Sequence, residues 1–310
     1  MSFHTHVVVN ENARQLLRRP ALIERIEQAA SGSPVHVTRT LENLDEVALA
    51  IAEQDAQRVV LCGGDGTYMA GVTAIWRAFA DRQLPELVLA PAGTVATVAR
   101  NWGQRRGVVD TVRRAVERRD QRVTERPSLL VSDASGERVG FIFGTGLVAR
   151  FFDRYYKTGA GGYPTAARIV ARVFWGSLVN DAYAKSVLDP LSCDLCVDGR
   201  SLPHDGYSLI VASVVRDLGL HMLVTYRAGV DPHRPHLVAC AQPTRQLGPQ
   251  APRVLLGRPL RGPGVYDGLV GEACVTFTDA EGGPWVLDGD VFHSKAVRVR
   301  AGPRLRVVAF

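Results

Sequence analysis

A run of small and acidic residues, VVLCGGDGT from Val59 to Thr67, is the segment best suited to chemistry. Its apolar half is typical of a buried strand, and its glycines let the backbone turn tightly and approach a ligand. A helix that begins at such a turn presents unpaired N–H groups and a positive dipole, which favour a phosphate group. We therefore expect a strand, a glycine turn and a helix N-terminus that bind a phosphorylated ligand. A plain strand-to-helix turn is the alternative.

Asp65 is unusual in a phosphate cradle, because its carboxylate repels an anion unless it holds Mg²⁺ or takes up a proton. Both are tasks that phosphoryl transfer requires. The segment is not a Walker loop, since no Gly-Lys-Ser/Thr follows, and its glycine spacing differs from GxGxxG. A nucleotide-binding loop of another kind is the interpretation that fits, with Asp65 as a candidate base or metal ligand.

Two further segments could contribute to the same chemistry. Pro91-Ala92-Gly93-Thr94 also follows a predicted strand and opens a helix. The carboxyl ends of parallel strands share one sheet edge, so the two glycine turns are expected to lie together. Asp288-Gly289-Asp290 could supply carboxylates near the C-terminus, although Asp-Gly is also a common β-turn.

The elements that must position these residues are predicted from hydrophobic periodicity. In the first third, short apolar strands alternate with helical patterns, which indicates a parallel sheet in a doubly wound α/β domain. The expected strands there cover 7–10, 35–38, 58–62 and 87–90. From about Arg126 the pattern changes to runs of period two, which predict an antiparallel β-sandwich or meander. Its expected strands cover 129–132, 139–143, 208–215, 221–226, 236–240 and 273–278, with a helix at 164–178 and a proline-rich loop at 243–264.

The composition, 46% hydrophobic and 22% charged, is that of a globular chain. The length of 310 residues predicts two domains, with one large α/β unit as the alternative. We find no apolar stretch long enough to span a membrane and no basic-then-apolar leader, so an exported or membrane-spanning protein is not expected. Five scattered cysteines favour a reducing compartment, with the cytoplasm as the default. The net charge of +6 favours an anionic partner such as phosphate or acidic lipid. Nucleic-acid binding is not expected, because no recognition motif accompanies the charge.

GGDGT, then PAGTxxxxAR, then an acidic LDGD near the C-terminus occur in an order that resembles the diacylglycerol kinase and sphingosine/ceramide kinase superfamily of lipid kinases. The resemblance covers nearly the whole chain. It implies an α/β nucleotide-binding domain over 1–125, a β-rich lipid-binding domain over 126–295, and a return of 296–310 to the first domain. It also implies transfer of phosphate from ATP, with Mg²⁺, to a hydroxyl of diacylglycerol, ceramide or a sphingoid base at the inner membrane surface. A homodimer is a further implication.

The same resemblance implies roles for individual residues. Asp65 and Asp290 are the implied catalytic carboxylates, with Asp65 preferred as the base, and Asp65 and Asp288 are the implied metal ligands. Asp153 and Tyr156 would contact the lipid headgroup, although solvated charges at a helix start are an equal alternative. The implied ATP-binding residues are Asn10, Arg14, Gly63, Gly64, Gly66, Thr67, Gly93, Thr94, Lys157 and Arg168. The chain departs from the family at Val95-Ala96-Thr97, where the family has GTxN, and at Asp290, where it has Glu.

Two rival functions follow from these features. Related nicotinamide-dinucleotide kinases share the glycine loop, so a kinase of a soluble substrate such as NAD is one alternative. A non-catalytic nucleotide- or lipid-binding protein is the other, because of the two departures.

Several other patterns have more ordinary interpretations. The aromatic residues from Phe151 to Tyr156, with Phe174 and Trp175, could line an acyl-chain cleft or a membrane-touching lip, but core packing is favoured. The arginines between 105 and 126 could dock on anionic lipid, but a solvated helix face is favoured. His233 and His236 are expected in a solvated turn.

Overall fold

The computed structural model describes residues 4–93, 95–119, 121–159 and 162–310. The chain divides into two compact units, unit 1 with Met1–Arg126 and Arg304–Phe310, and unit 2 with Pro127–Pro303. Of the strands between 296 and 310, β19 (Leu305–Ala309) joins the sheet of unit 1, whereas β18 (Ala296–Ala301) pairs within unit 2. The chain therefore leaves unit 1, builds the whole of unit 2, and returns for one final strand.

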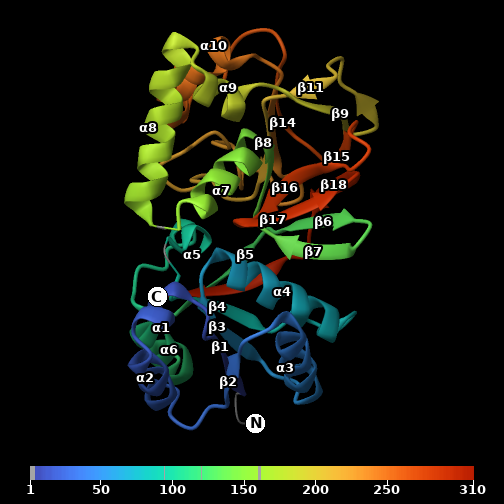
Figure 1. Ribbon diagram of the computed structural model, residues 1–310. Helices are drawn as coiled ribbons and strands as arrows, with labels where there is room; N and C mark the ends of the chain where they lie inside the picture. Colours follow the sequence, from blue (N-terminus) through green and yellow to red (C-terminus); the bar gives the residue numbers. More distant parts are fainter. Residues whose placement is uncertain (1–3, 94, 120, 160–161) are drawn as a thin grey trace. The chain divides into compact units, whose positions relative to one another are not determined.

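Unit 1 is built on a six-stranded sheet of order β2-β1-β3-β4-β19-β5 (Figure 1). Its first four strands along the chain are β1 (Thr5–Asn10), β2 (Val35–Thr38), β3 (Arg58–Gly63) and β4 (Glu86–Pro91). These pair in parallel, as does β4 with β19, whereas β5 (Arg122–Arg126) runs antiparallel to β19. The predicted α/β class is confirmed, and the carboxyl ends of β1, β3 and β4 lie at one edge of the sheet.

Helices cover both faces of this sheet (Figure 1). The helices are α1 (Arg14–Arg18), α2 (Ala21–Ala29), α3 (Leu41–Glu53), α4 (Asp65–Phe79), α5 (Thr97–Asn101) and α6 (Val108–Glu117). Alternate residues of a strand point to opposite faces. Val60 and Cys62 of β3 accordingly pack with apolar residues of α2 and α6, and Leu61 between them packs against Gly71 of α4. This two-sided burial explains why the central strands are continuously apolar.

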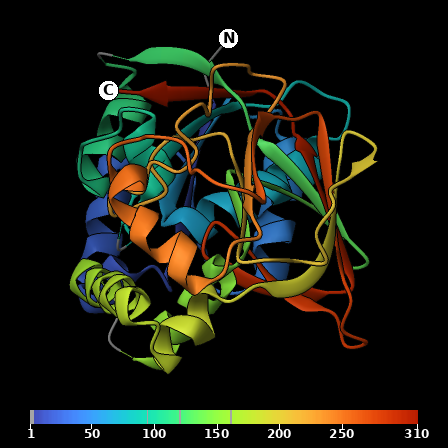
Figure 2. The same cartoon turned by 90° about the horizontal axis from the view of Figure 1, so that it is seen from above.

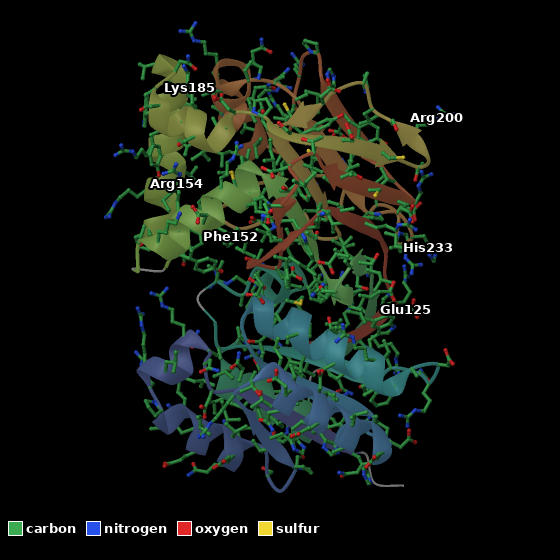
Figure 3. All side chains as sticks on the ribbon, turned by 45° about the vertical axis from the view of Figure 1, so that its right-hand side comes forward. Glu125, Phe152, Arg154, Lys185, Arg200 and His233 are labelled. Carbon is green, nitrogen blue, oxygen red and sulfur yellow. The ribbon has the colours of Figure 1, made fainter. Side chains whose placement is uncertain are left out.

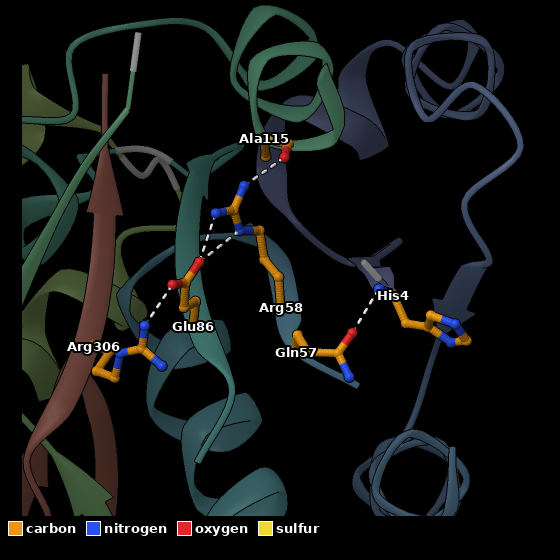
Figure 4. Close-up of polar contacts among 6 residues, drawn as sticks. All are labelled: His4, Gln57, Arg58, Glu86, Ala115 and Arg306. Carbon is orange, nitrogen blue, oxygen red and sulfur yellow. Dashed lines mark hydrogen bonds and ion pairs between the residues drawn. The ribbon is translucent and has the colours of Figure 1, made fainter. Parts of the chain in front are cut away.

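A buried ion pair ties β19 to the middle of the sheet (Figure 4). Arg58, at the start of β3, is fully buried and bonds through Nη2 to Glu86 Oε2 at 2.5 Å. Its Nη1 donates to the carbonyl of Ala115 in α6 at 2.6 Å. Arg306 of β19 donates to the second oxygen of Glu86 at 2.7 Å. Burial lowers the pKa of Arg58, and the Glu86 carboxylate opposes that shift. One carboxylate thus joins strands that lie more than two hundred residues apart in the chain.

Unit 2 contains two antiparallel sheets, as expected for a β-sandwich. One has the order β10-β9-β15-β18-β6-β7, with β11 also paired to β9, and the other has the order β14-β13-β12-β8-β16-β17. The strands are β6 (Leu129–Asp133), β7 (Gly136–Gly140), β8 (Ile142–Gly146), β9 (Leu191–Val197), β10 (Arg200–Ser201), β11 (Gly206–Tyr207), β12 (Leu209–Ser213), β13 (His236–Cys240), β14 (Val265–Leu269), β15 (Glu272–Phe277), β16 (Gly283–Leu287) and β17 (Asp290–Ser294).

Helices pack together along one side of unit 2 (Figures 1 and 2). They are α7 (Leu147–Lys157), α8 (Tyr163–Val179), α9 (Ala182–Leu188), α10 (Thr244–Leu247), the 3₁₀ turn η1 (Gly248–Gln250) and α11 (Ala251–Leu255). The helix α8 contacts α7, α9, α10 and η1. Its predicted range of 164–178 is close to the observed one. None of the helices in the described part of the chain has the length and apolar character needed to span a bilayer.

Five sequence predictions in unit 2 were wrong. Core packing was favoured for the aromatic residues of α7 and α8, but Tyr156 is 53% and Trp175 65% exposed. The expected strand 221–226 is irregular, because Leu220 and His221 adopt positive φ angles that break an extended chain. The expected loop 243–264 contains α10, η1 and α11, and prolines at their first turns explain how helices tolerate that composition. The expected strand 139–143 is divided between β7 and β8. His236 is not solvated: it is fully buried in β13, and its Nε2 lies 2.8 Å from Asp267 Oδ1.

Candidate functional site

The carboxyl ends of three parallel strands meet in a hydrogen-bonded cluster of loops within unit 1. Asn10, the last residue of β1, donates from Nδ2 to Thr67 Oγ1 at 2.8 Å. The carbonyl of Gly63, at the end of β3, accepts from the N–H groups of Ala92 and Gly93 after β4, at 2.8 and 2.9 Å. The predicted neighbours Asn10, Gly63, Thr67 and Gly93 are therefore together at one edge. We call this arrangement the loop cluster.

Close packing requires glycine at two positions of the loop cluster. A Cβ on Gly93 would lie 2.5 Å from Gly64 Cα, and a Cβ on Gly63 would lie 2.3 Å from the Thr67 side chain. Both distances are shorter than any real contact, so a larger residue at either position must displace its neighbour. Gly64 is the N-cap of α4 and Gly66 lies in the first turn of that helix.

Asp65 links the two glycine turns. It is the first residue of α4, and its carboxylate accepts from the backbone N–H groups of Thr97 at 2.8 Å and Val98 at 2.9 Å. These residues begin α5, so Asp65 satisfies N–H groups that have no partner within that helix. Burial raises the pKa of the Asp65 carboxyl, and the two N–H groups oppose the rise. A carboxyl with a raised pKa is suited to accept a proton.

Ala96, just before α5, adopts a left-handed conformation with φ 52° and ψ 54°. This conformation costs an alanine about 1 kcal/mol, and Asn or Gly adopts it more readily. Ala96 is one of the three residues where the sequence departs from the family's GTxN pattern. The backbone at this position is left-handed even though the asparagine that favours it is absent. The hydrogen bonds from Thr97 and Val98 to Asp65 help to hold this conformation.

Gln15 belongs to the loop cluster but was missed by sequence reasoning. Its Nε2 donates to the carbonyl of Gly93 at 2.9 Å, and its backbone N–H donates to the carbonyl of Ala92 at 3.0 Å. No motif marks this position, since its relevance depends on β1 and β4 ending at the same edge. Arg14, predicted from the resemblance, precedes it as the first residue of α1 and is half-buried. Thr94 lies outside the described residues.

The acidic segment near the C-terminus forms a hairpin turn in unit 2. Leu287 pairs with Asp290, and between them Asp288 and Gly289 have φ angles of 51° and 97°. Two positive φ angles are the signature of a two-residue hairpin turn, which Asp-Gly favours. Both oxygens of the buried Asp288 carboxylate accept backbone N–H groups, from Phe141 at 2.9 Å and Ile142 at 3.0 Å. Asp290 is exposed, and the hydroxyl of Tyr156 donates to the adjacent carbonyl of Gly289 at 2.7 Å.

The remaining predicted contacts lie on two helices of unit 2. Asp153 and Lys157 form an exposed ion pair one turn apart on α7, at 2.8 Å. Arg168 is exposed on α8. Exposed pairs of this type contribute little to stability.

The described residues do not form a protein-held metal centre. They contain no group of three or more His, Cys, Asp or Glu side chains that could hold an ion. The oxygens of both predicted ligands, Asp65 and Asp288, also already accept backbone N–H groups. A Mg²⁺ ion that acts here would therefore depend on ligands outside the protein, such as the phosphates of a bound nucleotide.

The start of α4 is the feature of the loop cluster suited to bind an anion. Its first intrahelical bond runs from the Tyr68 N–H to the Gly64 carbonyl, so the N–H groups of residues 65–67 have no partner within the helix. Thr67 Oγ1 accepts from Asn10, which leaves the hydroxyl proton for donation. Together with the helix dipole, these donors favour a phosphate beside the Asp65 carboxylate.

Comparison with known proteins agrees with this geometry. Residues 4–125 match the family model of the diacylglycerol kinase catalytic domain, which confirms the resemblance seen in the sequence. No curated protein sequence matches the chain. Among solved structures, a candidate diacylglycerol kinase from Bacillus anthracis has a TM-score of 0.67 at 15% identity, covering 99% of this chain and 97% of its own.

Two other solved structures have the same fold. A second diacylglycerol kinase from Bacillus anthracis has a TM-score of 0.60 at 12% identity, and the alignment covers 99% of this chain and 97% of that one. The yeast NADH kinase, solved with NADH, has a TM-score of 0.52 at 12% identity and coverage of 99% and 84%. The chain therefore has the two-part fold of these solved structures.

Proposed function

We propose, from the match of residues 4–125 to the diacylglycerol kinase catalytic domain, that this protein transfers the γ-phosphate of ATP to a hydroxyl group of a membrane lipid. The loop cluster is the single observation on which the proposal depends. It combines an anion-binding helix start with a carboxylate whose pKa is raised, the two features that phosphoryl transfer to an alcohol needs.

The proposed roles follow from the contacts. The N–H groups of residues 65–67 and the hydroxyl of Thr67 bind phosphate oxygens and stabilise the charge that builds up on them. Gly63, Gly64 and Gly93 let the backbone come close, while Asn10 and Gln15 hold the turns in place. Asp65 orients the acceptor hydroxyl and takes its proton. The phosphates of ATP would hold Mg²⁺, which would neutralise part of their charge.

A lipid acceptor is supported by the comparison with the two Bacillus anthracis proteins, which are named for diacylglycerol and align over nearly their full length. The C-terminal unit is a β-sandwich, as the resemblance to lipid kinases implies. Diacylglycerol, ceramide and sphingoid bases all remain within the proposal. Contact with the membrane surface is part of it, because such acceptors reside in the bilayer.

A soluble acceptor is the second candidate, favoured by the yeast NADH kinase, whose fold covers 99% of this chain. The two candidates share the loop cluster and the proposed role of Asp65. They differ in the acceptor, so the product distinguishes them.

The test is a phosphate-transfer assay with labelled ATP and Mg²⁺. The acceptors are mixed micelles that carry diacylglycerol, ceramide or sphingosine, each alone, and NAD in solution. We expect label in one lipid and a rate roughly 10² to 10⁴ times lower in Asp65→Asn, the range lost with a general base. The matched control is Asp81→Asn, at an exposed aspartate of unit 1.

Each other outcome contradicts a definite part of the proposal. Label in NAD alone refutes the lipid acceptor and keeps the kinase. ATP binding without transfer to any acceptor, unchanged in Asp65→Asn, indicates a non-catalytic binding protein. An Asp65→Asn protein that folds and retains the full rate excludes Asp65 as the base.

A further inference from the structure

The outward face of α8 in unit 2 is apolar and basic. Its exposed residues recur at intervals of three and four positions, which places them on one side of the helix. They are Pro164, Ala167, Arg168, Ala171, Arg172, Trp175, Leu178 and Val179. We call this set the α8 face. In an ordinary surface helix the polar residues face water, and here the outward side carries the apolar ones.

The largest apolar residues of the α8 face are the most exposed. Trp175 is 65% exposed, Val179 75% and Leu178 49%. Tyr163 at the start of the helix and Tyr156 near the end of α7 are also exposed. Exposed apolar side chains at several neighbouring positions mark an interaction surface, whereas single scattered ones do not.

The opposite side of α8 is packed, so the helix cannot rotate to bury these residues. Ile169, Gly176 and Ser177 are buried. A Cβ on Gly176 would lie 2.6 Å from the Asp181 carboxylate, and one on Gly248 of η1 would lie 2.0 Å from Ser177 Oγ. These contacts fix which side faces outward.

The charge around the α8 face is positive. Between Tyr163 and Val179 the charged residues are Arg168 and Arg172, and the segment contains no Asp or Glu. Arg172 and Arg154 of α7 both stack on the ring of Tyr183, at 4.3 and 4.5 Å. Lys185 of α9 is also exposed, and Figure 3 shows Arg154 and Lys185 on the helical side of the unit.

The nearby acidic groups are occupied by other partners. Asp153 pairs with Lys157, and Asp181 accepts from the N–H of Ala184 as the N-cap of α9. They do not neutralise the arginines of the α8 face.

We propose that the α8 face docks on a bilayer surface that carries anionic headgroups. Tryptophan, leucine and valine enter the boundary between headgroups and acyl chains, while arginines bind the phosphates. A second copy of this chain fits the surface less well, because the helix offers no Asp or Glu to pair with the arginines of its copy. The inference deepens the proposed function by naming the surface through which a lipid kinase would reach its substrate.

The test measures binding without ATP, so its result is independent of catalysis. The full chain is centrifuged with vesicles of phosphatidylcholine alone, or of equal parts phosphatidylcholine and phosphatidylglycerol. We expect binding to the anionic vesicles, weakened by added salt, and at least tenfold weaker in the double variant Trp175→Ser/Val179→Ser. The matched control is Val230→Ser, at a valine that is 70% exposed outside the helices of unit 2.

Fluorescence gives a second measurement. Trp102 and Trp285 are buried and Trp76 is half-buried, so Trp175 is the exposed tryptophan among the four of the chain. Anionic vesicles should shift the emission to shorter wavelength in the native protein, and Trp175→Phe should abolish that shift.

Three results would overturn the inference. One is failure to bind either vesicle, and another is binding that the α8 variants leave unchanged. The third is a dimer, seen by sedimentation, that these variants dissociate while vesicles do not bind. Kinase activity on micelles is measured in parallel. An α8 variant that loses vesicle binding but keeps its activity on micelles supports the inference. A native protein that binds vesicles but has no kinase activity refutes the proposed function alone.

Discussion

Gly93 faces Gly64 across the two glycine turns with their backbones in contact, so that no side chain fits between them. These residues follow different strands, β4 and β3. Their contact brings the N-terminus of α4 beside the turn before α5, and Asp65 then bonds the two helices together. The loop cluster is thus a rigid unit whose glycines are needed for close packing as much as for approach to a ligand.

Replacing Gly93 should therefore damage both stability and nucleotide binding. In Gly93→Ala the new methyl group would lie 2.5 Å from Gly64 Cα. We expect a loss of about 1–3 kcal/mol in the free energy of unfolding, typical of overpacking. Urea denaturation and calorimetric titration of ATP would measure the two effects.

Gly107→Ala is the control for this variant, because nothing lies within 4 Å of a Cβ there. It should leave ATP affinity unchanged. Equal affinity for ATP in Gly93→Ala and in the native protein would show that the Gly64 backbone can shift without damage to the nucleotide site.

Ala96→Gly should stabilise the protein. The left-handed backbone at Ala96 is strained for alanine and unstrained for glycine. Part of the gain is offset because glycine makes the unfolded chain more flexible, so we expect a rise of roughly 0.5 kcal/mol. Thermal and urea denaturation would detect it. Ala99→Gly, within the α5 helix, should lower stability by about 0.5–1 kcal/mol, and a similar loss in both variants would contradict the strain argument.

The Glu86 carboxylate should be essential for folding of unit 1. Glu86→Gln leaves the guanidinium of Arg58 buried without a negative partner. Breaking a buried pair from one side costs about 3–5 kcal/mol. Arg306→Gln should cost far less, because Arg306 is partly exposed and Arg58 keeps its partner. Guanidinium denaturation would measure the loss in the free energy of unfolding for both variants. A larger loss in Arg306→Gln than in Glu86→Gln would contradict the argument that the buried Arg58 is the costly partner to leave unpaired.

Stability should fall in mild acid because of two stacked histidines. His6 Nδ1 lies 3.1 Å from His36 Nε2, and burial is the main cause that lowers the pKa of both. The unfolded chain then binds protons more readily than the folded one below about pH 6.5. The melting temperature should be insensitive to pH above this value and should decrease as the pH falls below it.

His36→Phe keeps a stacked ring and removes one of the two titrating groups. We expect a flatter profile of melting temperature against pH in this variant. An identical acid slope in the variant and the native protein would assign the pH dependence to other groups.

Much of the architecture could be predicted from the sequence because it depends on local patterns. Continuous apolar runs before Gly63 and Pro91 marked central parallel strands, and period-two runs after Arg126 marked an antiparallel second half. Asp288-Gly289 carried the local signature of a hairpin turn. Three of the predictions that failed, at 221–226, 243–264 and His236, concerned segments whose conformation depends on tertiary contacts rather than on periodicity.

The sequence by itself determined that two glycine turns and an aspartate follow parallel strands, because glycine, apolar runs and helix periodicity act over a few residues. Only the tertiary structure decided what these groups contact. Asp65 bonds to Thr97 and Val98, Gln15 to Gly93, and Arg306 to Glu86, and each pair joins segments that strand order brings together from distant parts of the chain. The outward face of α8 was decided in the same way, since the packing of Gly176 and Ser177 against neighbouring segments fixes which side remains exposed.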